Sequence, residues 1–140
     1  MKKSTFIKSM VVYAAVVATT QVSAEIKVGF SAPLSGPVAS VGQDQYDGFM
    51  LGLELLHGKF GGQPVTVFKE DDQLKPELGN QIARKFIDRD KVDALVGLGF
   101  SNVLMASLPR IVESGTVAIA SNSEIQSAIL RLTFFISFPN

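Results

Sequence analysis

Apolar positions along the chain change repeatedly between two spacings. Four short apolar runs have the length and the residue types of β-strands, and they predict strands at residues 26–31, 64–69, 94–98 and 117–120. Between these runs apolar residues recur every three or four positions, which is the spacing of one helical face. This spacing predicts helices at residues 44–56, 76–90 and 102–113. Gly58 is expected to end the first helix in the left-handed conformation.

Strands that alternate with helices of this length are typical of a parallel sheet with right-handed crossovers. The fold class is therefore α/β, with a doubly wound parallel sheet covered on both faces. Residues 123–130 fit a further short helix and residues 133–138 a fifth strand. Loops at residues 32–42, 70–75, 99–102 and 121–124 would then follow the carboxyl ends of the strands, where open α/β sheets bind ligands.

The first residues have the pattern of a secretory signal peptide. Three lysines lead into an apolar run at residues 10–18, and the small-residue sequence Val22-Ser23-Ala24 follows. We expect residues 1–24 to be removed by cleavage after Ala24. The alternative, an amphipathic first helix or a membrane anchor, is disfavoured because the run is shorter than the about 20 residues of a spanning helix.

The composition of the chain indicates which binding partners and which cell compartment to expect. The chain is 46% hydrophobic and 19% charged, and it has no cysteine. All 13 acidic residues follow the signal peptide, which carries three of the 13 basic residues, so the remainder has a net charge of −3. A mildly acidic chain without a basic cluster is not expected to bind nucleic acid. Export without disulfides suits a bacterial periplasm.

The segment from Val96 to Asn102 is the first candidate for a ligand site. Its glycines let a backbone come close, and Ser101 would stand at the start of a helix, where a single negative charge such as a carboxylate is favoured. The alternative is that Ser101 is only an N-cap. Ser121, Asn122 and Ser123 repeat this chemistry after the next strand. Two such strand ends side by side favour a polar pocket.

Catalytic chemistry finds little support. His57 is the only histidine and is expected at a helix end, so no catalytic triad can be assembled around it. Asp71 and Asp72 are adjacent and point in different directions, which favours helix capping over metal binding. A dinucleotide-binding pattern fails because Asn102 takes the place of its third glycine. We therefore expect a protein that is not an enzyme, with no cofactor and no metal.

The same motifs, in this order, carry a resemblance to a known family. They are residues 26–37 (Ile-Lys-Val-Gly-Phe-Ser-Ala-Pro-Leu-Ser-Gly-Pro) with Gly42, then 70–72, 97–102 and 115–120. Together they resemble the periplasmic substrate-binding proteins of branched-chain amino-acid ABC transporters, the leucine/isoleucine/valine-binding type with the type I periplasmic-binding fold.

The resemblance implies two doubly wound lobes that close over a small ligand and dock on a membrane permease. Residues 25–140 would be the first lobe, incomplete and without the second lobe, and would bind amino acids weakly by themselves. Alternatives are a periplasmic ligand-sensing or interaction module of the same fold, or an inactive truncated remnant. The residues that the resemblance assigns to the α-carboxylate of the ligand are Ser101, Asn122, Ser123 and Glu124, although the family usually has small residues and a threonine in the second loop.

Overall fold

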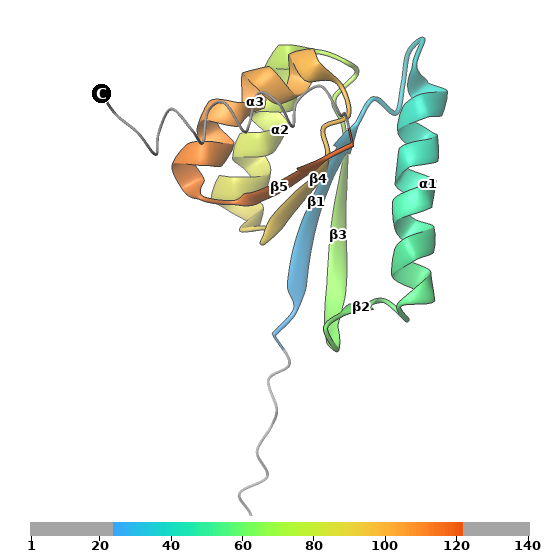
Figure 1. Ribbon diagram of the computed structural model, residues 1–140. Coiled ribbons are helices and arrows are strands. Elements are labelled where there is room, and N and C mark those ends of the chain that lie inside the picture. Colours follow the sequence, from blue (N-terminus) through green and yellow to red (C-terminus); the bar gives the residue numbers. More distant parts are fainter. Residues whose placement is uncertain (1–23, 122–140) are drawn as a thin grey trace, which may run out of the picture.

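A five-stranded sheet forms the centre of the molecule (Figure 1). The computed structural model describes residues 24–121. The strands lie in the order β2-β3-β1-β4-β5, and all neighbours pair in parallel except β2 and β3, which are antiparallel. This confirms the α/β class. The strands are β1 (Ile26–Ala32), β2 (Lys59–Phe60), β3 (Gln63–Asp71), β4 (Ala94–Gly97) and β5 (Val117–Ala120).

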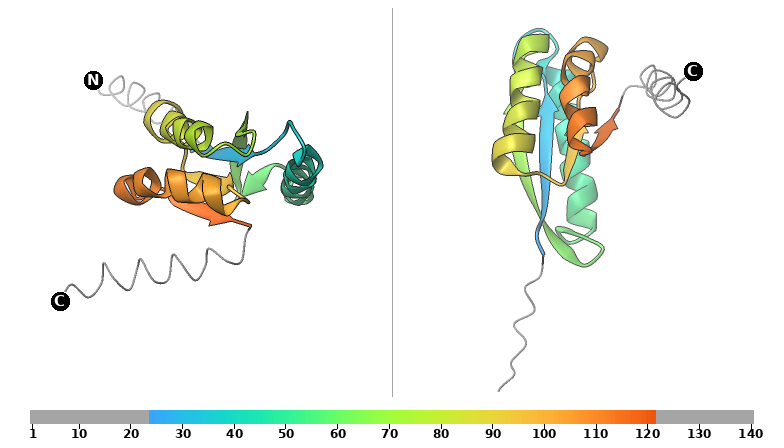
Figure 2. Two further views of the ribbon diagram at one scale, coloured as in Figure 1. Left: turned by 90° about the horizontal axis from the view of Figure 1, so that it is seen from above. Right: turned by 90° about the vertical axis from the view of Figure 1, so that its left-hand side faces the viewer.

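Helices lie on both sides of this sheet. They are α1 (Ala39–Leu55), α2 (Pro76–Arg84), which continues as a π-helix, η1 (Lys85–Asp90), and α3 (Ser101–Ser114). α2 and α3 pack against each other on one side, and α1 lies on the other (Figure 2). This is the doubly wound arrangement. The expected signal peptide up to Ser23, and the expected helix and strand after residue 122, lie outside the described residues.

The main core lies between the sheet and the pair α2 and α3. Gly29 of β1 packs there against the ring of Phe86, which is fully buried. The next residue, Phe30, points to the opposite side and contacts α1 through Tyr46 and Phe49, with ring centroids 5.1 and 5.6 Å apart. The core cluster consists of Ile82, Phe86, Ile87, Val92, Leu95, Leu98, Val103, Leu104 and Ile111.

The two faces of the sheet are not equally covered. Ala118 and Ala120 of β5 pack on the core cluster. The alternating residues Val117 and Ile119 are 59% and 58% exposed, because α1 packs on β1 and leaves these side chains of β5 uncovered. Within residues 24–121, the expectation of a sheet covered on both faces is therefore right for its centre and wrong for β5.

The structure differs from the sequence prediction in several details around α1, and several other boundaries shift by one or two residues. α1 begins at Ala39, five residues early, because its first turn is mostly polar or small and shows no apolar periodicity. The short hairpin of β2 and β3 was not predicted. Two residues after α1 are in the left-handed conformation, His57 with a φ of 55° as well as the predicted Gly58 with a φ of 69°.

The described segment contains no helix that is both long enough and apolar enough to cross a membrane.

Candidate functional site

The carboxyl ends of the four parallel strands meet at one edge of the sheet, which is the upper edge in Figure 1. The segments that follow them are residues 33–38 after β1, 72–75 after β3, 98–100 after β4, and Ser121 after β5. The helices α1, α2 and α3 all begin at this edge. It is the edge at which open α/β sheets bind ligands.

β4 ends in a tight backbone contact with β1. Gly97 has a φ of 96°, and a Cβ atom there would overlap the carbonyl oxygen of Ser31. The backbone N–H of Leu98 donates to this same oxygen at 2.8 Å, and Leu98 is buried with a φ of 49°. At Gly97 the absence of a side chain serves the contact between β4 and β1, and the expected approach of this backbone to a ligand stays a prediction.

Ser101 lies two residues beyond this contact, at the start of α3. It is half-buried and is the first residue of the helix. The N-cap position belongs to Phe100, which is in the extended conformation and makes no side-chain capping hydrogen bond. The alternative that Ser101 is the N-cap is therefore wrong, since the helix begins one residue earlier than predicted. No acidic residue lies in the first turn of α3, where a negative charge is favoured.

Asp71 and Asp72 join the loops around this edge. Oδ1 of Asp71 accepts the backbone N–H groups of Leu34, at 2.7 Å, and Gln73, at 2.9 Å. Oδ2 of Asp72 accepts the hydroxyl of Ser31 at 2.9 Å, and its Oδ1 accepts the N–H of Leu74 at 2.9 Å. We call these two residues the aspartate clasp.

The prediction that the clasp residues cap a helix is wrong. The N-cap of α2 is Lys75, which makes no side-chain capping bond. The aspartates instead hold Gln73 and Leu74 in the left-handed region, with φ values of 51° and 60°, which residues other than glycine rarely adopt. Asn102 of α3 adds a further tie, since its Nδ2 donates to the carbonyl of Leu74 at 3.2 Å.

The two carboxyl groups of the clasp differ in their surroundings. Burial raises the pKa of Asp72 above its ordinary value, against the opposing hydrogen bonds from Leu74 and Ser31. Partial burial also acts to raise the pKa of Asp71. Hydrogen bonds from the Ser35 side chain and from backbone N–H groups outweigh it there and lower that pKa. The pKa values of the two adjacent carboxyl groups are thus shifted in opposite directions.

Of the predicted site residues, the structure places only Ser101. Asn122, Ser123 and Glu124 lie outside the described residues. Two features of this edge were not predicted from the sequence, namely the Ser31–Asp72 pair and Gln45, whose carboxamide lies against Gly99. The pair could have been suspected because a serine and an aspartate end neighbouring strands.

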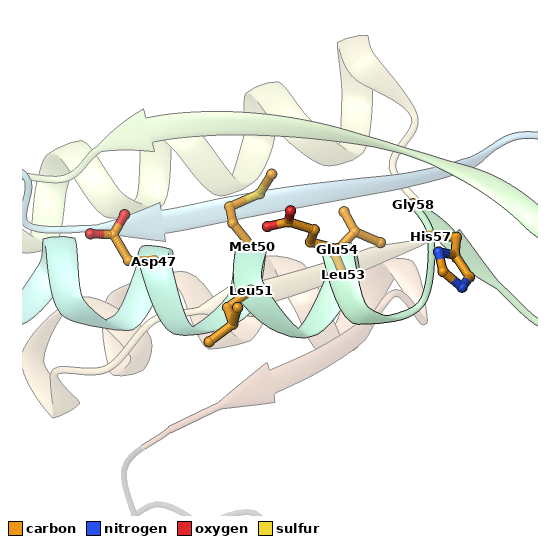
Figure 3. A pocket seen from close by; sticks show the side chains of 7 residues that line it. All are labelled: Asp47, Met50, Leu51, Leu53, Glu54, His57 and Gly58. Atoms are coloured by element: carbon orange, nitrogen blue, oxygen red, sulfur yellow. The ribbon is translucent and has the colours of Figure 1, made fainter.

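A shallow cavity of about 670 Å³ lies away from this edge (Figure 3). It runs along the second half of α1 and the turn that follows, and its lining mixes apolar residues with two acids and His57. It contains none of the strand-end residues, so we do not assign it to the ligand site. Within residues 24–121, no three His, Cys, Asp or Glu side chains are grouped closely enough to hold a metal ion.

Comparison with known proteins agrees with this geometry. The periplasmic binding protein family model matches residues 25–137. The chain is 27% identical over 107 residues to an amino acid binding protein of Pseudomonas aeruginosa, and 33% identical over 99 residues to a Leu/Ile/Val-binding protein homolog of Brucella abortus. A solute binding protein of an ABC transporter from R. palustris, solved with benzoate, superimposes with a TM-score of 0.68 at 32% identity.

These matches cover most of this chain and a small part of each relative. They include 75% and 69% of this chain, but only 29% and 26% of the two curated relatives. The benzoate complex is matched over 71% of this chain and 28% of its own. The chain thus spans little more than a quarter of the length of the proteins it matches. It belongs to the periplasmic binding protein family.

Proposed function

We propose that residues 25–140 form the N-terminal lobe of the solute-binding component of an ABC importer, and that this lobe is incomplete. It is exported to the periplasm by the signal peptide at residues 1–24. There it binds an amino acid of the branched-chain type, or a related small carboxylate, between two lobes and delivers it to a membrane permease. Its role is to bind the ligand and not to transform it.

The observation that carries the proposal is the convergence of polar groups on one strand edge. The start of α3, with Ser101, lies at the end of β4, and the end of β5 is beside it in the sheet. A helix start without a nearby acid favours an anionic group. The named relatives bind amino acids, and the structural neighbour holds benzoate. A carboxylate is common to these ligands.

The expected second loop fits the same proposal. Asn122, Ser123 and Glu124 directly follow Ser121, at the end of β5. We propose that they complete the ligand site with Ser101, and that Asn122 and Ser123 supply the donors to the carboxylate. The second lobe would supply the opposite wall, so the chain by itself is expected to bind ligand far more weakly than a two-lobed protein. A ligand-sensing module of the same fold, or an inactive remnant, is the competing account.

The coding DNA beyond codon 140 tests the two-lobe proposal first. A second βα lobe that continues in any of the three frames supports an importer component. A stop codon followed by no such lobe favours the remnant. Calorimetry on the complete product of the gene, with leucine, isoleucine, valine and benzoate, then tests the function. Binding of none of these four contradicts the proposed ligand class.

Ser101→Ala is expected to weaken carboxylate binding about 10- to 100-fold, because a hydrogen bond to a charged group contributes about 1.5–3 kcal/mol. Calorimetry with the tightest of the four ligands measures the change. Ser114→Ala is the matched control, since Ser114 lies at the opposite end of α3 and its hydroxyl donates to the carbonyl of Ile111. Equal affinities for Ser101→Ala and wild type would remove Ser101 from the site.

A further inference from the structure

A buried hydrogen-bond acceptor lies unused beside the strand ends. Gln45 belongs to α1, and its Oε1 atom is buried and has no hydrogen-bond partner in the described part of the chain. Leaving such an acceptor unpaired costs about 1–3 kcal/mol. Unpaired buried groups are uncommon in folded proteins and call for a specific explanation.

The surroundings of this atom connect it to the ligand edge. Nε2 and Oε1 of Gln45 lie 2.6 and 2.8 Å from the point that a Cβ atom of residue 99 would occupy. Ser121 Oγ lies 2.9 Å from the same point. Three elements therefore meet over the Cα atom of Gly99, namely α1 and the ends of β4 and β5. Only glycine leaves room for this meeting.

The hydroxyl of Ser121 is the donor that best fits the unused acceptor. Gln45 Oε1 and Ser121 Oγ lie 2.8 and 2.9 Å from the same point beside Gly99, so the two atoms are neighbours. Rotation of the Ser121 side chain to another rotamer would let its hydroxyl donate to Oε1. Ser121 is exposed in this structure, and water competes for its hydroxyl. A ligand that closes the site would remove that water, and the hydrogen bond would strengthen in the drier surroundings.

We propose that Gln45 is a positioning residue of the ligand site, whose Oε1 accepts the Ser121 hydroxyl when a carboxylate ligand binds. The bond fixes the end of β5, from which the expected second ligand loop starts. This inference rests on the proposed function. It assigns to α1 a share in ligand affinity, although Gln45 does not touch the ligand itself.

A purely structural role for Gln45 makes a different prediction. If the carboxamide only packs α1 onto the sheet, its removal would lower the stability of the ligand-free protein. If its acceptor is used only in the bound state, removal would leave ligand-free stability unchanged or raise it, because an unpaired buried acceptor disappears. Ligand affinity would then fall while ligand-free stability does not.

The test uses the complete product of the gene, with leucine and benzoate as probes. Gln45→Met keeps the length of the side chain and removes the acceptor, Gln45→Glu keeps an acceptor, and Ser121→Ala removes the donor. We expect Gln45→Met and Ser121→Ala each to weaken binding about tenfold, which is the effect of one lost hydrogen bond. The double variant is expected to be no weaker than either single variant.

Two controls complete the design. Gln43→Met changes a glutamine on the same helix whose Nε2 donates to Asp47 at 2.7 Å on the exposed side, and it is expected to leave affinity unchanged. Gln45→Glu keeps an acceptor but adds a buried negative charge beside the carboxylate site, so it is also expected to weaken binding. Urea unfolding without ligand should give Gln45→Met a midpoint no lower than that of wild type.

The outcomes separate the inference from the proposed function. Additive losses in the double variant, unchanged affinity in Gln45→Met, or a lower ligand-free midpoint would each overturn the role of Gln45 while wild type still binds. A wild type that binds neither leucine nor benzoate contradicts the proposed function and removes the basis of the inference. Coupled losses with unchanged ligand-free stability support it.

Discussion

Gly97→Ala is expected to destabilise the fold by about 4 kcal/mol, since a strained backbone conformation and overpacking each cost about 1–3 kcal/mol. The φ of 96° at Gly97 is unfavourable for alanine, and the added methyl group would overlap the carbonyl oxygen of Ser31. That oxygen belongs to the central strand and accepts the N–H of Leu98, so it cannot move without disturbing the sheet. Urea unfolding followed by circular dichroism measures the loss.

Gly115→Ala is the matched control for this prediction. Gly115 also has a positive φ, 70°, but no atom lies within 4 Å of the point where its Cβ would be. Its substitution should therefore cost only the backbone strain, about 1–2 kcal/mol. If the two variants lose the same stability, the contact with Ser31 does not constrain the protein. The loss of about 4 kcal/mol expected for Gly97→Ala is a large fraction of the free energy of unfolding of a typical domain, which is about 5–15 kcal/mol.

Asp72→Ala is expected to cost about 2–4 kcal/mol, because it leaves the buried hydroxyl of Ser31 and the part-buried N–H of Leu74 without their acceptor. Ser31 and Asp72 are 0% and 1% exposed, so water cannot replace the lost carboxylate. The N–H of Leu74 also loses its acceptor while that residue remains in the left-handed region. Thermal unfolding of the two proteins at pH 7 measures the difference.

Asp72→Asn separates shape from charge at the same position. Asparagine can accept from Leu74 through its oxygen and donate to Ser31 through its nitrogen, so it should retain most of the stability. Burial raises the pKa of Asp72 above 3.8, which means that the folded state binds this proton more tightly than the unfolded state. The wild type therefore gains stability as the pH falls through the folded-state pKa, and asparagine does not.

The pH dependence follows from this sign. The stability of Asp72→Asn relative to that of wild type is expected to be highest at pH 7 and to fall as the pH approaches 4. Unfolding midpoints of both proteins across this range provide the measurement. A difference that is constant with pH, or that grows in favour of asparagine on acidification, contradicts the assignment of a charged, buried Asp72.

The spacing of apolar residues predicted the fold class because the residues at this spacing are the ones that pack in the core. Ile82 and Phe86 recur at helical spacing and both lie in the core cluster. The alternation along β5 likewise separates half-buried from exposed positions. Boundaries were predicted less well where local sequence carries no apolar signal. The start of α1 is set by a turn in which the N–H of Ala39 donates to the carbonyl of Gly36, at 3.2 Å.

The candidate site was predicted in part. Its position at the strand ends and the location of Ser101 follow from the order of elements. The roles of the aspartates did not, since a carboxylate near a helix start fits a cap equally well. Register decides between these uses: Ser31 pairs with Glu70, which brings its hydroxyl close to Asp72. Gln45 could not be predicted, because only the folded chain brings it to Gly99, 54 positions away.

The aspartate clasp has a consequence for how this lobe can diverge. Surface loops normally tolerate insertions and deletions. Here the loop after β1 provides the N–H of Leu34 to Asp71, and Ser31 at the end of that strand provides its hydroxyl to Asp72. A change in the length of either loop would therefore disrupt the other. We therefore expect relatives that bind other ligands to differ at this edge by substitution of side chains and not by insertions or deletions in these loops.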